Sequence, residues 1–182
     1  MATMNQIGLG LSGSTGTGNF VGANTPTLIT PVLGAATATS INFGGSTLSS
    51  YIATTAWTPV VTFATPGDLS VNYAIQTGNY SKIGSIVNIS GRLGFTPTYT
   101  TASGNLNITG APYSSVINNS FGPVLMQNVI LSVGYTSVLA ALSGNIIAFI
   151  QYSSAQFASG LSTPQIVSGV TYYFDFTITY NI

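Results

Sequence analysis

The feature that most constrains the fold is a strict two-residue alternation near the end of the sequence. From Tyr172 to Tyr180 a large apolar side chain occupies every second position, and Thr, Tyr and Asp fill the positions between them. Successive side chains of a β-strand point to opposite faces, whereas one face of a helix repeats every 3.6 residues. The segment therefore predicts a strand with an apolar and a polar face.

The same period recurs over residues 69–75 and 87–95, and β-rich runs predict further strands at 58–64, 78–83, 106–109, 129–135 and 146–152. Dipeptides such as Pro66-Gly67 and Thr77-Gly78 are typical of turns. Residues 137–142 fit a helical face as well as a strand, and we assign them as a strand. Together these patterns predict an all-β chain folded as an antiparallel β-sandwich, jelly-roll-like in type.

The chain divides near residue 55. The first 50 residues are dominated by Gly, Thr, Ser and Ala, whereas Trp57, most Phe and all Tyr except Tyr51, just before the division, lie beyond it. We therefore predict an extended arm over residues 1–55 and a β-sandwich knob domain over residues 56–182. Pro26 and Pro31 disfavour a central strand in the arm. The arm buries too little apolar area to order itself, so copies of the chain or another protein would hold it.

Only four residues carry a formal charge, Asp68, Lys82, Arg92 and Asp175, and the chain has no Glu, His or Cys. General acid–base catalysis and metal binding both need those residue types, so we expect no enzyme activity, metal or cofactor. A glycan-degrading enzyme would call for a pair of carboxylates, and only two Asp are present. One Lys and one Arg give no footprint for nucleic acid. Stability should be nearly flat between roughly pH 5 and 9.

The composition instead favours self-association. Net charge is zero, 45% of residues are hydrophobic and mean hydropathy is +0.46, which invites association of an isolated chain. No run of 18 or more apolar residues is present, so we expect no membrane insertion. Apolar faces buried between identical subunits would account for the same composition.

The segment Gly8-Leu9-Gly10-Leu11-Ser12-Gly13 matches the dinucleotide-binding pattern GxGxxG. That pattern works only between a buried strand and a helix, with an acidic residue about 20 positions later. Only seven residues precede it and the first acid is Asp68, so we interpret these glycines as part of the extended arm.

Three further features have both a structural and a binding interpretation. Arg92 and Asp175 are expected to form an exposed or inter-subunit ion pair, the alternative being a clamp on a ligand carboxylate or sugar. Trp57 is expected to close the end of the core, the alternative being a sugar-stacking platform. Aromatic rings beside amides suit neutral sugars, and the candidate glycan contacts on this basis are Tyr99, Tyr113, Asn118, Asn119, Phe121 and Tyr152.

One resemblance connects these features. Residues 56–63 (AWTPVVTF), 76–80 (QTGNY) and 106–112 (LNITGAP), with the Gly-rich arm over 8–21 and 25–34 (TPTLITPVLG), resemble the β-rich domain and upstream repeats of tail-fibre and related surface proteins of tailed bacteriophages and prophages. The resemblance covers about two-thirds of the chain. It departs from long fibres in that no long shaft is present.

The resemblance implies a non-enzymatic, homotrimeric virion protein, assembled in the host cytoplasm, whose knob attaches the phage to a host surface glycan. The alternative is a capsid decoration or head-fibre protein without a dedicated receptor. In either case the arm would join other copies or other virion proteins. The apolar residues expected to make those contacts are Ile7, Leu9, Leu11, Phe20, Val21, Leu28, Ile29, Val32 and Leu33.

Overall fold

The structure is a computed structural model of the 182-residue chain, and it describes residues 41–43, 45–48, 50–118 and 120–182. These residues belong to one compact unit, Ala38–Ile182. Every regular element within the described ranges is a strand, and all pairings are antiparallel. The predicted all-β, antiparallel class is therefore confirmed.

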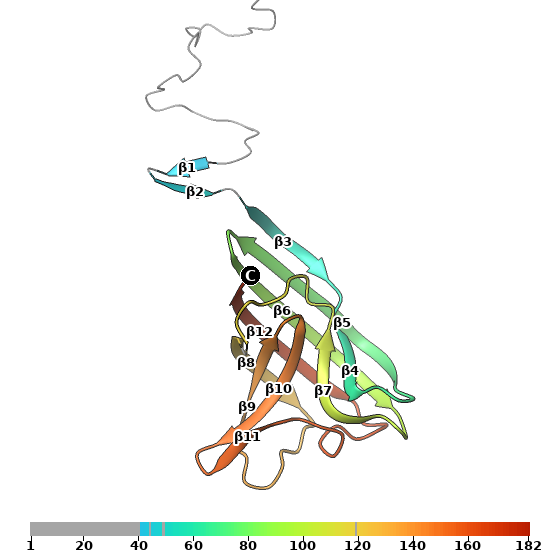
Figure 1. Ribbon diagram of the computed structural model, residues 1–182. Coiled ribbons are helices and arrows are strands. Elements are labelled where there is room, and N and C mark those ends of the chain that lie inside the picture. The colour runs from blue at the N-terminus through green and yellow to red at the C-terminus, as the bar shows by residue number, and fades with distance from the viewer. Residues whose placement is uncertain (1–40, 44, 49, 119) are drawn as a thin grey trace, which may run out of the picture. The chain divides into compact units, whose positions relative to one another are not determined.

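Two short strands, β1 (Ile41–Phe43) and β2 (Ser46–Leu48), form a separate hairpin. The remaining ten strands form one sheet (Figure 1). They are β3 (Tyr51–Trp57), β4 (Val60–Thr65), β5 (Ser70–Ile83), β6 (Ile86–Thr98), β7 (Ser103–Thr109), β8 (Ser120–Gln127), β9 (Ser137–Ser143), β10 (Ile146–Ser153), β11 (Gln156–Gly160) and β12 (Tyr172–Asn181). Their order is β3-β5-β6-β12-β8-β9-β10-β7-β4, with β11 beside β10.

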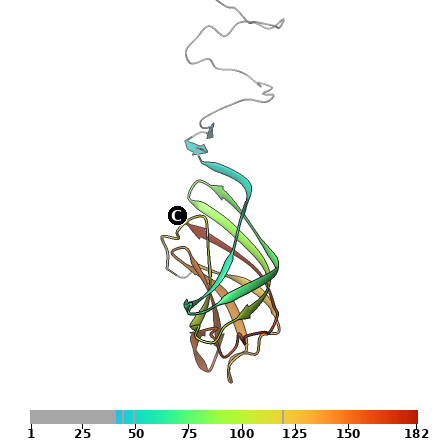
Figure 2. The ribbon, with the colours of Figure 1, turned by 90° about the vertical axis from the view of Figure 1, so that its right-hand side faces the viewer.

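Strand β8 connects the two halves of this sheet. Its first four residues, from Ser120 to Pro123, pair with β9, and its last four, from Val124 to Gln127, pair with β12. A side chain at Gly122 would come within 2.9 Å of the Thr177 carbonyl carbon, so glycine permits the crossing. The sheet curls in this way into a β6 half (β3, β5, β6, β12) and a β10 half (β9, β10, β11, β7, β4), as the two views show (Figures 1 and 2). The two separate sheets of a jelly roll are not confirmed.

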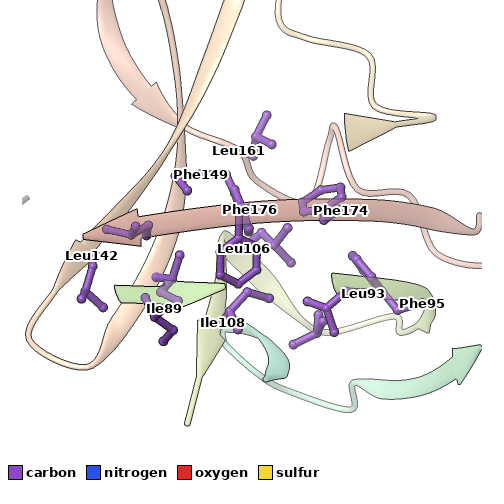
Figure 3. Close-up of a cluster of buried hydrophobic side chains, with 14 of the residues drawn as sticks. Ile89, Leu93, Phe95, Leu106, Ile108, Leu142, Phe149, Leu161, Phe174 and Phe176 are labelled. Atoms are coloured by element: carbon purple, nitrogen blue, oxygen red, sulfur yellow. The ribbon is translucent and has the colours of Figure 1, made fainter. Parts of the chain in front are cut away.

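The hydrophobic core fills the space between the two halves (Figure 3). Strand β6 contributes Ile89, Leu93 and Phe95, and β12 contributes Phe174 and Phe176 from the face that the alternation predicted. Facing them are fully buried side chains from β7, β9 and β10, among them Leu106, Ile108, Leu142 and Phe149. The Phe149 ring meets Phe174 edge-on, with centroids 4.8 Å apart, a favourable aromatic geometry.

One row of the β6 half places two glycines between two large rings. Trp57 pairs with Gly78, Gly78 with Gly91, and Gly91 with Phe176. A Cβ at Gly78 would lie 2.6 Å from Trp57 Cε2, and one at Gly91 would lie 2.7 Å from Phe176 Cε1. The two rings therefore pack directly on backbone, which explains glycine within otherwise regular strands.

This row corrects one prediction of the sequence. The expected turn at Thr77-Gly78 is wrong, because residues 70–83 form the single strand β5 and Gly78 marks a close ring contact instead. A bulge between Tyr73 and Ile75 also shifts the side-chain alternation. Ile75 therefore pairs with Gly94 on the outer face, where its side chain was expected to share the face of Tyr73.

Two more corrections concern β8 and its neighbours. The expected strand at 129–135 is wrong: the segment is a loop, Gly134 has φ of 91°, and Val133 is 99% exposed. The real strand in this region, β8, escaped prediction because Gly122 and Pro123 interrupt its pattern. The assignment of 137–142 as a strand is confirmed by β9.

The sheet begins at Tyr51, a few residues before the predicted division near residue 55, because β3 pairs with β5 along its length. The boundary between arm and knob stays a prediction. The nine apolar arm residues assigned to assembly contacts, from Ile7 to Leu33, lie outside the described residues.

Candidate functional site

A shallow groove crosses the outer face of the β6 half. Two adjoining hollows of about 220 and 410 Å³ make it up, and they share Asp175 and Phe176. The two hollows adjoin because the same two rows of outward side chains flank both. Its floor is the backbone of the row Gly78, Gly91 and Phe176 described above.

The pairing register of the strands determines which side chains form the walls of the groove. In one row Thr77 pairs with Arg92, Arg92 with Asp175, and Asp175 with Leu125. In the neighbouring row Asn79 pairs with Ser90 and Ser90 with Thr177. The groove thus has hydroxyl, amide and charged groups along β5, β6 and β12, and an apolar end on β8 formed by Pro123, Val124 and Leu125.

The ion pair at the centre of the groove is exposed. Arg92 Nε lies 3.4 Å from Asp175 Oδ1, and the two side chains are 67% and 47% exposed. The expectation that these residues form an exposed ion pair is confirmed. Among the described residues no protein group binds the terminal nitrogens of Arg92 or the second oxygen of Asp175.

The other two charges are occupied within the fold. Asp68 accepts hydrogen bonds from the backbone and hydroxyl groups of Thr100 and Thr101, at 2.7 Å from the Thr101 N–H. These bonds, with that from the Thr100 hydroxyl the strongest, hold the pKa of the Asp68 carboxyl well below its usual range. Asp68 therefore joins the turn before β5 to the loop between β6 and β7.

Lys82 points to the inner side of the sheet and is nearly buried. Its ammonium donates to the Ser50 hydroxyl and lies 5.9 Å from the centre of the Tyr113 ring, a cation–π arrangement. Arg92 and Asp175 are consequently the two charged groups in the described ranges that remain available to a ligand.

Two of the predicted glycan contacts are engaged inside the protein. The Tyr99 hydroxyl donates to the carbonyls of Thr163 and Ile166, and its ring meets Phe63 edge-on. The Tyr113 ring packs edge-on against Tyr80 at 5.8 Å. Both rings are partly buried against the core.

The remaining predicted contacts lie elsewhere. Phe121 and Tyr152 are exposed on the outer face of the β10 half, opposite Ala141 and Ser137 of β9. Four residues of strand separate those positions, which is roughly 13 Å. The Asn118 amide oxygen accepts a bond from the Ser143 hydroxyl, and Asn119 lies outside the described residues. The structure does not gather this set into one site.

Trp57 lies in the core cluster, and its indole N–H donates to the Ser90 carbonyl at 2.9 Å. Its position leaves no free ring face for a sugar. The groove residues Thr77, Asn79, Ser90 and Thr177 were missed by the sequence reasoning. The sequence did show that these residues alternate in step with Arg92 and Asp175 and so face the same side of their strands. Which of them lie next to one another depends on the strand register, which the sequence does not give.

A second surface feature is an apolar tip where the loop over residues 128–136 meets strand β11. Val133 is 99% exposed and Phe157 is 97% exposed. The Tyr135 hydroxyl donates to the Phe157 carbonyl at 2.7 Å, which ties this loop to β11.

No group of three His, Cys, Asp or Glu that could hold a metal ion occurs in the described ranges. In the same part of the chain, no helix is long and apolar enough to cross a membrane.

Comparison with known proteins gives one informative match. No protein-family model matches the chain, and no curated protein matches it. Among solved structures the chain is similar to the Dettilon tailspike protein, with a TM-score of 0.50 and 17% identity over 70% of this chain. The matched region is 23% of the tailspike chain, so this protein spans about a quarter of its length. At this identity the match shows a shared fold.

Proposed function

We propose that this protein is a bacteriophage virion surface protein that acts in attachment to the host cell. The observation that carries the proposal is the fold shared with a phage tailspike over 70% of the chain. The resemblance of residues 56–63, 76–80 and 106–112 to tail-fibre surface domains points in the same direction. The apolar tip at Val133 and Phe157 adds a surface suited to contact with another body.

In its finer form the proposal is a homotrimeric short fibre or receptor-binding knob that recognises a glycan without cleaving it. The carboxylates support the non-catalytic part. Asp175 lies opposite Arg92, and Asp68 binds beyond the far end of β6 at Thr100. The six residues from Arg92 to Thr98 alone span roughly 20 Å of strand. Most glycoside hydrolases use two carboxyl groups roughly 5–9.5 Å apart, and one copy of the chain lacks such a pair.

In a trimer, three weak glycan sites can bind one cell surface at the same time, and their combined affinity is higher than that of a single site. Mass measurement of the purified full chain by light scattering tests this. The expected mass is three times the 18.7 kDa of one chain. A monomer at micromolar concentration would contradict the trimer.

The attachment role is tested by locating the protein and by measuring cell binding. Immunogold electron microscopy of the virion should place the label on the tail, and fluorescent full-length protein should bind host cells saturably. Unlabelled protein should compete with that binding. Label on the head together with an absence of cell binding would refute attachment and support a capsid decoration role.

A further inference from the structure

We propose that the groove across β5, β6, β12 and β8 is a binding site for a neutral saccharide that presents vicinal hydroxyls. The proposal rests on the attachment function above and names the site and ligand class for it. It assigns ligand contact to Arg92 and Asp175, in place of the loop aromatics.

The distribution of charge is the first reason. Asp68 and Lys82 are occupied by internal bonds, as described above, while Arg92 and Asp175 lie side by side at the junction of two hollows. An exposed ion pair contributes little to stability. Placement of the available charges in the groove is therefore better explained by contact with a ligand than by folding.

The free bonding capacity of the pair is the second reason. Asp175 meets Arg92 at 3.4 Å, between Oδ1 and Nε. The terminal edge of the guanidinium remains able to donate, and the other carboxylate oxygen remains able to accept. Adjacent donor and acceptor groups match two neighbouring sugar hydroxyls, each of which donates and accepts.

The groove walls extend this pattern. Asn79, Ser90 and Thr177 supply an amide and two hydroxyls on the opposite wall, and Leu125 gives an apolar surface at one end. On the same face the Tyr173 ring lies over Gly94, with 38% of the residue exposed. Polar walls with apolar ends suit a sugar, which has hydroxyl edges and C–H faces.

Other ligand classes fit less well. Asp175 offsets the charge of Arg92 at contact distance, so the groove holds no net charge for an anion. A divalent cation prefers several carboxylate or carbonyl oxygens, and the groove contributes one carboxylate. Nucleic acid would need several cations, and the groove has one.

The test uses Arg92 as its own probe. It is the sole arginine, because Lys82 is the other basic residue, so its Nε–H gives a single arginine side-chain signal in a ¹⁵N-resolved NMR spectrum of the full-length protein. The titrants are glucose, galactose, mannose and rhamnose, which cover equatorial–equatorial and axial–equatorial vicinal hydroxyls. Glucuronic acid and sialic acid are titrated as acidic sugars for comparison.

At least one neutral sugar should shift the Arg92 signal saturably, with a dissociation constant on the order of 1 mM. Asp175→Asn should weaken that binding at least tenfold. A matched control is Asn88→Ala, which removes the bond from Asn88 to Thr179 at 2.9 Å on the same face outside the groove. The control should bind as the unmodified protein does. Circular dichroism should show both variants folded.

Several results would overturn the proposal. One is the absence of a saturable shift with every neutral sugar up to 100 mM. Another is a shift with the acidic sugars alone. A third is a loss of sugar affinity in Asn88→Ala equal to that in Asp175→Asn. A change of oligomeric mass in Asp175→Asn would assign the groove to contact between copies instead. Cell binding separates the two proposals: if Arg92→Ala binds cells as well as the unmodified protein, the groove assignment fails and attachment stands. If the unmodified protein binds no cells, attachment fails whatever the titration shows.

Discussion

Exchange of Gly78 for alanine tests whether a ring seated on backbone holds the β6 half together. The new Cβ would lie 2.6 Å from Trp57 Cε2 and 2.7 Å from Cδ1. Backbone pairing between β3 and β5 fixes Gly78, so the indole has to move. When it moves, the bond from its N–H to the Ser90 carbonyl is broken. The substitution therefore acts through Trp57.

The expected magnitudes follow from these contacts. Overpacking of this kind costs about 1–3 kcal/mol, and loss of the indole hydrogen bond adds about 1 kcal/mol. Trp57→Ala alone should cost about 3–5 kcal/mol. In a chain that already carries Trp57→Ala the ring is absent, so Gly78→Ala should be neutral or slightly stabilising, since alanine loses less entropy on folding than glycine. The coupling energy between the two positions is then about 2–4 kcal/mol.

Urea and thermal melts followed by far-UV circular dichroism measure all four members of this cycle, including those that lack tryptophan. For a unit of this size 2 kcal/mol corresponds to about 6 °C in Tm. Gly94→Ala is the matched control, because its Cβ would meet the Tyr173 ring at 2.9 Å and that exposed ring can turn away. Additive effects of Gly78→Ala and Trp57→Ala, or a Gly94→Ala variant as unstable as Gly78→Ala, would refute the reasoning.

Three further outcomes are expected. The pKa of Asp68 is depressed by its threonine bonds, so its stabilisation should be complete above about pH 5 and lost as the pH falls below about 4, and Asp68→Asn should remove that acid dependence in thermal melts. Burial raises the pKa of Tyr180 to about 12, so stability should fall as the pH rises from about 10 towards 12, and Tyr180→Phe should lose one late-titrating phenol in ultraviolet absorbance at 295 nm. Phe149→Ala should cost about 3–5 kcal/mol in urea unfolding because its ring contacts Phe174 and Phe176, whereas Phe157→Ala at the exposed tip should leave stability unchanged.

The buried face of β12 could be predicted from the sequence alone. In β12 every second residue from Tyr172 to Tyr180 is in the core, so the alternation is complete. In β5 the local pattern gave wrong predictions. The bulge after Tyr73 reverses which face the following side chains point to, and Gly78 makes room for the ring of Trp57, which is distant in sequence. Both features depend on partners that local patterns do not reveal.

The candidate site was predictable only in part, for a related reason. Parity placed Arg92 and Asp175 on polar faces, and their pairing is observed. The walls of the groove come from strands up to roughly 100 residues apart, and β8 joins them only through a change of partner at Pro123 and Val124. A loop-based search for aromatic rings therefore selected Tyr99 and Tyr113, which the core uses.

The same strand register determines both the position of the ion pair and the packing of the core. The register that sets Phe174 opposite Leu93 and Phe176 opposite Gly91 also sets Asp175 opposite Arg92. A slip of one residue along β12 would turn Asp175 towards the core and expose the phenylalanines, and burial of an unpaired charge costs several kcal/mol. The core thus fixes the two charged groups on a paired, central part of the sheet. Groups held by such an element keep their mutual geometry before a ligand arrives, which is what a weak binding site needs in order to be selective.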